Sequence, residues 1–132
     1  TRATFESAVL DGEAAMPSQE QDSSGTVAKM VSETPGAISY LAFSYFDDSI
    51  KALSVDGVAP ETANVEDNSW VIWAYEHMYT REDEDESTAA VTQAFIEFML
   101  SDDFAATVVE QGFIPMGDMQ VKKDAEGNIT AA

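Results

Sequence analysis

Small hydroxyl residues stand at the start of two predicted helices, where the first backbone N–H groups have no partner within the helix. The sequence SSGT at 23–26 precedes an apolar stripe at helical spacing over 27–31, and Thr1 opens a helix predicted over 1–10. Free amides, the positive end of the helix dipole and hydroxyl donors together suit phosphate or sulfate. These residues therefore predict anion binding, at Thr1 and at Ser24, Gly25 and Thr26.

The second of these helix starts has an equally direct structural interpretation. Ser24 is a good N-cap, because its hydroxyl can accept from the free amides of the first turn. Pro35 moves the residue before it out of the α region and Gly36 can take a positive φ, so the helix must end there. The sequence alone leaves both interpretations open for 24–26, a helix cap or a ligand site.

No catalytic or metal-binding pattern is present in the sequence. The chain has no Cys, and His77 is the only histidine, which excludes thiol catalysis and sites built from two histidines or from cysteine. Nucleophile elbows, phosphate-binding loops before Lys-Ser/Thr and dinucleotide fingerprints are absent. The acidic block at 81–86 lacks the spacing of a calcium loop and is predicted to be a solvated loop. We therefore expect no enzyme activity, no cofactor and no metal.

Charge sets a strong limit on partners. The 132 residues include 25 Asp and Glu against 6 Lys and Arg, a formal charge of −19. Such a surface repels nucleic acid and anionic lipid, so neither is expected as a partner. Any anion must be held by local dipoles against the global field. Thr1 is not a natural start residue, and we expect the chain to be a mature or excised piece of a longer protein.

The order of elements predicts an α/β fold. One α/β domain is expected over 1–121, with a flexible C-terminal tail over 122–132. Continuous apolar runs predict buried central strands at 37–43 and 70–75 of a small mixed sheet. A further strand is predicted at 50–55, before the hairpin signal Asp56-Gly57. The sheet is expected to be flanked by four helices, predicted over 1–10, from the cap at Ser24 to the stop at 34–36, over 88–100 and over 101–112.

Five segments resemble the phosphate-binding proteins of bacterial phosphate ABC transporters, most closely the lipid-anchored Gram-positive branch. They are TRATFE at 1–6, GTVA at 25–28, PGAISY at 35–40, WVIWAYEHMYT at 70–80 and FIPM at 113–116. The resemblance covers about residues 1–121 with few gaps. It implies a type II periplasmic-binding-protein fold, in which two α/β lobes close on a dehydrated phosphate ion.

The resemblance also implies which part of such a protein this chain contains. Residues 1–69 would be the second lobe, and 70–121 would be the segment that returns to the first lobe, which is itself absent. In the family the second lobe opens its phosphate loop with Ser-Gly-Thr after an Arg, and only the Thr could be present, as Thr1. The family pattern does not identify Arg2 as a phosphate ligand. In the same pattern, residues 23–26 match the start of a helix that has a structural role.

The function that the resemblance implies is solute recognition for phosphate uptake. The full protein would be extracellular and lipid-anchored at the cell surface, and would pass inorganic phosphate to a membrane permease. Micromolar binding, near −8 kcal/mol, needs several hydrogen bonds of roughly 1.5–3 kcal/mol each, so this chain alone is expected to bind phosphate weakly or not at all. The alternative is a ligand-free structural or interaction domain that self-associates through exposed apolar surface.

Overall fold

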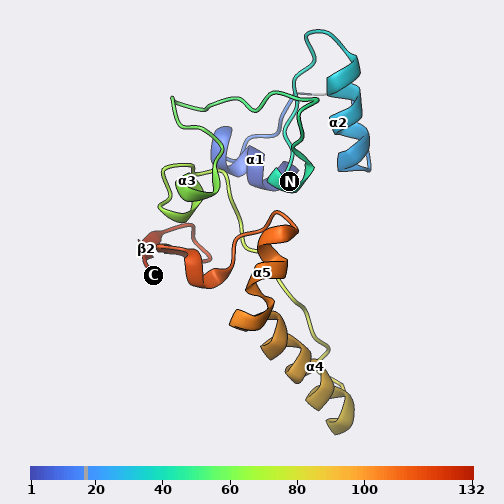
Figure 1. The fold of residues 1–132 in the computed structure, drawn as a ribbon, viewed down its shortest axis with the longest axis vertical. Coiled ribbons are helices and arrows are strands. Elements are labelled where there is room, and N and C mark those ends of the chain that lie inside the picture. The colour runs from blue at the N-terminus through green and yellow to red at the C-terminus, as the bar shows by residue number, and fades with distance from the viewer. Residues whose placement is uncertain (17) are drawn as a thin grey trace.

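The computed structural model describes residues 1–16 and 18–132 and contains helices and one small sheet. In Figure 1, α1, α2 and α3 lie in one half of the molecule, and α5 and α4 extend one after the other from the other half. We call α4 and α5 together the arm. In chain order the elements are α1 (Arg2–Val9), α2 (Ser24–Glu33), the 3-10 turn η1 (Phe43–Tyr45), α3 (Thr62–Glu66), α4 (Glu86–Met99), α5 (Asp102–Glu110), the 3-10 turn η2 (Met116–Asp118), β1 (Val121–Lys123) and β2 (Ile129–Ala131).

Helix α2 lies where the sequence predicts it, but its cap is one residue earlier. The N-cap is Ser23, which has extended dihedrals and accepts a hydrogen bond from the Thr26 backbone N–H at 3.4 Å. Ser24 is already helical, so the prediction that it caps the helix is wrong by one position. The helix ends as predicted, with Thr34 extended before the proline and Gly36 at a φ of +80°.

The predicted central strands do not form. Residues 37–42 and 71–80 belong to no helix or strand ladder, and η1 begins at Phe43. Of the strand predicted at 50–55, only Val55 pairs, in a single bridge to Val58 across the predicted hairpin turn. An apolar run favours a strand, but a strand also needs a neighbour to complete its hydrogen bonds. The mixed sheet flanked by helices is therefore replaced by a mixture of helices and one small sheet.

That sheet lies in the segment predicted to be a flexible tail. Strands β1 and β2 are antiparallel, with Val121 opposite Ala131 and Lys123 opposite Ile129. Lys123 Nζ lies 4.0 Å from the centre of the Trp73 ring and donates to the Trp73 carbonyl at 3.0 Å. Partial burial lowers the pKa of Lys123. The predicted tail is instead a hairpin that is anchored on residues 50 positions earlier.

The buried core is small and joins distant parts of the chain. Val65, Trp70 and Met119 are its buried members, and Phe43 is among the side chains packed around them. The accessible surface is 10007 Å², whereas a compact protein of 14.3 kDa exposes about 6,800 Å². Among the described residues, no helix combines the length and apolar character needed to cross a membrane.

Gly112, after α5, lies close to the backbone of η1. It has a φ of +79°, and a Cβ at this position would lie 2.8 Å from Ser44 Cα in η1. We expect Gly112→Ala to lower the free energy of unfolding by at least about 2 kcal/mol, because left-handed strain and a backbone clash add together. Urea denaturation followed by tryptophan fluorescence measures the change.

Two other glycines separate these causes. Gly36→Ala introduces the strained φ in open space and should cost about 1 kcal/mol, and Gly117→Ala should change stability by less than about 0.5 kcal/mol. Equal effects for all three substitutions would show that the contact between Gly112 and Ser44 is absent in solution.

Candidate functional site

Thr1 lies at the N-terminus of α1, where a hydroxyl group can donate a hydrogen bond to an anion. It is the N-cap of α1, and its side chain makes no capping hydrogen bond, while its backbone carbonyl accepts from Phe5 N–H at 3.0 Å. The first-turn amides of α1 and the Thr1 hydroxyl therefore face solvent at the positive end of the helix. The arrangement can donate a few hydrogen bonds to an anion, but Thr1 is exposed and water competes for each of them.

Arg2 is engaged elsewhere, although it is the cation next to Thr1. Its Nη2 donates to Glu20 Oε1 at 2.6 Å, and its Nε lies 3.5 Å from Glu6 Oε1. The hydrogen bond to Glu20 is also the main cause that raises the pKa of Arg2 and lowers that of Glu20. The guanidinium group is thus directed at carboxylates.

Helix α1 is held in place by aromatic stacking. The rings of Phe5 and Tyr40 lie 4.3 Å apart and are tilted by 11°, so α1 packs on the extended segment before η1. Thr1 is thereby placed at one end of a fixed helix.

The start of α2 is occupied by its own cap and lies beside a carboxylate. Gly25 lines a hollow of about 480 Å³ between α2 and η1, together with Lys29 and Asp47. Lys29 Nζ is 3.9 Å from Glu33, and Asp47 accepts from Ser49 N–H at 2.8 Å. Hydrogen bonds from Ser49 hold the pKa of Asp47 below its usual value, so the side of the hollow at Asp47 is negative while Lys29 is a cation of the same lining. Within the described part of the chain, no hydrogen bond or hollow connects 24–26 with Thr1.

The acidic block at 81–86 has a structural role that the sequence analysis missed. Asp85 is the N-cap of α4, and its Oδ1 accepts from the backbone N–H groups of Ser87 and Thr88 at 3.1 Å. Arg81 pairs with Asp83 at 2.8 Å. The described residues contain no cluster of His, Asp or Glu side chains suited to a metal ion. The S-T after the block could have indicated this cap, which begins α4 two residues before the predicted position.

Comparison with known proteins shows what the chain is similar to. No family model matches the chain. It is similar over nearly its whole length to bacterial phosphate-binding proteins, which confirms the resemblance found from the sequence.

The relatives themselves are PstS proteins. The chain is 45% identical over 129 residues to the phosphate-binding protein PstS of Bacillus subtilis, which covers 96% of this chain and 42% of that protein. It is 26% identical over 113 residues to PstS 2 from two strains of Streptococcus agalactiae, covering 84% of this chain and 38% of each relative. The chain thus spans about two fifths of the length of these relatives.

The cap at Asp85 gives a test of the acidic block. Hydrogen bonds from Ser87 and Thr88 hold its pKa far below the ordinary value of 3.8. Its capping effect should therefore be complete above pH 3.8 and should fade as the pH falls toward the lowered pKa. Asp85→Ala should reduce helicity at 222 nm, whereas Asp85→Asn should keep it, because Asn also caps. In the control, Asp83→Ala should leave helicity unchanged, and an equal loss in both alanine variants would contradict this role.

Proposed function

We propose that this chain is part of the phosphate-recognition component of an ABC-type phosphate importer and that it carries only part of the binding cleft. The observation that supports this most directly is the 45% identity over 129 residues to a phosphate-binding protein. Residues 1–69 would form the second lobe of a type II periplasmic-binding-protein fold, and 70–121 would return to the first lobe. The role is recognition rather than catalysis.

In this proposal Thr1 is a phosphate ligand. Its hydroxyl and the first-turn amides of α1 would donate to the ion, while the other lobe supplies the remaining donors. Ser24, Gly25 and Thr26 are the secondary candidates, although Asp47 on the adjoining wall opposes an anion there. The full protein would stand outside the cell on a lipid anchor and deliver phosphate to a membrane permease.

The physical argument for a partial site is the cost of removing water from phosphate. An ion that is enclosed by protein loses hydration worth many kcal/mol, which only several convergent hydrogen bonds can replace. One hydroxyl and one helix end cannot supply a binding energy near −8 kcal/mol. The chain alone should therefore bind phosphate much more weakly than a complete receptor.

Calorimetry on two proteins tests this proposal. The first is this chain alone, and the second is a chimera in which this chain replaces the matched region of the Bacillus subtilis protein. Phosphate should give no binding heat with the chain alone and clear binding with the chimera. In the chimera, Thr1→Ala should weaken binding roughly 10- to 150-fold, the loss of one hydrogen bond to a charged group. Ser7→Ala, at the other end of α1, is the matched control and should have little effect.

Each contrary result would contradict a different part of the proposal. A dissociation constant below about 100 µM for the chain alone would contradict the partial site. A chimera that folds and binds phosphate equally well with and without the Thr1 hydroxyl would remove Thr1 from the site. A folded chimera that gives no binding heat with phosphate would favour the alternative of a ligand-free interaction domain.

A further inference from the structure

The C-terminal hairpin carries a sequence pattern that the proposed function does not use. Asn128, Ile129 and Thr130 have the order Asn-x-Thr, with a residue other than proline in the middle. This pattern is the acceptor for N-linked glycans in secreted proteins, where the sugar is attached to the asparagine carboxamide. Glu126, two positions before the asparagine, supplies the acidic residue that bacterial oligosaccharyltransferases also require. The chain contains three asparagines, and only Asn128 is followed two positions later by a hydroxyl residue.

The three asparagines also differ in what their side chains do. Asn64 donates from Nδ2 to the Ala59 carbonyl at 2.9 Å, and Asn68 accepts at Oδ1 from the Trp73 indole N–H at 2.9 Å. Both of these asparagines are half-buried, whereas Asn128 is exposed. The asparagine that has the acceptor pattern is thus also the one whose side chain is open to a large partner.

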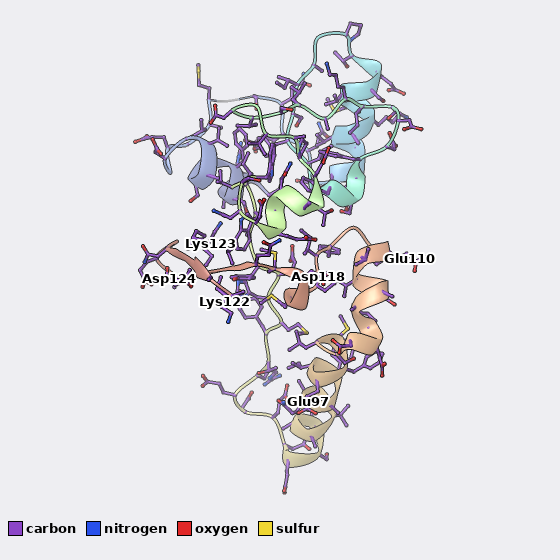
Figure 2. The ribbon with its side chains drawn as sticks, turned by 60° about the vertical axis from the view of Figure 1, so that its left-hand side comes forward. Glu97, Glu110, Asp118, Lys122, Lys123 and Asp124 are labelled. Carbon is purple, nitrogen blue, oxygen red and sulfur yellow. The ribbon has the colours of Figure 1, made fainter. Side chains whose placement is uncertain are left out.

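Asn128 lies in the turn of the hairpin, directly before β2. Its backbone N–H donates to Asp124 Oδ1 and its Nδ2 donates to Asp124 Oδ2, both at 2.8 Å. Hydrogen bonds, chiefly from the Asn128 side chain, lower the pKa of Asp124, so this carboxylate is ionised at neutral pH. Figure 2 shows Asp124 at the outer end of the hairpin, away from α4 and α5. The turn therefore holds the carboxamide in a defined position at the surface.

The strand after the turn presents the rest of the pattern. Asn128 continues the strand pairing, because its carbonyl accepts from Asp124 N–H at 3.1 Å, and Thr130 lies opposite Lys122 on β1. Successive side chains of a strand point to opposite sides, so Asn128 and Thr130 share one side and Ile129 lies on the other. Thr130 is exposed. An enzyme that must contact the carboxamide and the hydroxyl together finds both on one accessible side.

The hairpin differs in charge from the rest of the chain. Its charged residues are Lys122, Lys123, Asp124 and Glu126, so it is formally neutral, and the rest of the chain carries the whole net charge of −19. N-linked glycans come from a donor in which the oligosaccharide is joined to a membrane lipid through pyrophosphate. Strongly acidic surfaces are repelled by such an anionic group and by an anionic membrane. The neutral hairpin can approach the donor with less repulsion than the remainder of the surface.

We propose that Asn128 is an N-glycosylation site and that its substrate is an oligosaccharide joined to a membrane lipid through pyrophosphate. In the transfer, Asn128 Nδ2 forms a bond to the anomeric carbon of the first sugar. The bond from that carbon to the pyrophosphate oxygen breaks, and its electron pair leaves with the lipid pyrophosphate. One Nδ2 proton passes to a carboxylate of the transferase, and the remaining N–H can still donate to Asp124. This inference goes beyond the proposed function and takes from it only the location outside the cell.

Mass spectrometry of the hairpin peptide tests the site in the protein purified from the cells that encode it. Trypsin cleaves after Lys123, so Asn128 is recovered in the peptide that begins at Asp124. We expect this peptide to carry a saccharide, with fragment ions that place it on Asn128. Thr130→Val keeps the size and strand preference of the side chain but removes the hydroxyl, and should abolish the modification. Thr130→Ser, the matched control, should retain it.

Asn128→Gln should also abolish the modification, but it disturbs the hydrogen bonds of the turn, so the decision rests on the Thr130 variants. A peptide found only in its unmodified form would overturn the inference, and so would a saccharide that persists in Thr130→Val. Phosphate calorimetry on the chimera defined above keeps the two proposals apart. A glycosylated Asn128 together with a chimera that binds no phosphate would refute only the proposed function, and the reverse pair of results would refute only this inference.

Discussion

The burial of Trp70 is the interaction on which the rest of this structure depends. Its backbone N–H donates to the Asn64 carbonyl at 2.6 Å, and its side chain packs with Val65 and Met119. The ring of Phe43 lies 6.4 Å away, which brings η1 to the same point. The Trp70 indole thus brings together η1, α3 and the segment around Met119, just before the C-terminal hairpin. Because the buried core is so small, most other elements are attached to it by few contacts.

This small core explains why extended segments remain unpaired and why apolar faces remain exposed. A strand is stabilised by a neighbour on at least one edge, and an amphipathic helix by a surface against which its apolar side can pack. The segments around η1 have other contacts in place of a strand neighbour, since Phe5 stacks on Tyr40 and Gly112 lies against Ser44. Among the described residues, the main packing of the arm is between its own two helices.

Local signals in the sequence predicted local structure well. Caps and glycines located α1, α2, α4 and α5 to within about two residues but did not predict α3, and Asp56-Gly57 predicted the turn between Val55 and Val58. The strands failed because an apolar run indicates an extended conformation but cannot show whether a neighbour is present. The hairpin at the C-terminus was missed because its anchor, Lys123 on Trp73, joins residues 50 positions apart. For the candidate site, the sequence correctly predicted that Thr1 stands at a helix start, where it is the N-cap of α1. Local signals could not show that Arg2 is directed toward Glu20 and Glu6.

Amide hydrogen exchange across residues 74–80 tests most directly whether this chain is one part of a larger fold. In the isolated chain these amides should exchange at nearly unprotected rates, while the Trp70 amide, bonded to Asn64, should be among the slowest. In the chimera with the remainder of the Bacillus subtilis protein, the amides of this stretch that pair with a strand of that remainder should become protected. Strong protection of 74–80 in the isolated monomeric chain would show that the segment already has its partner, and would contradict this account.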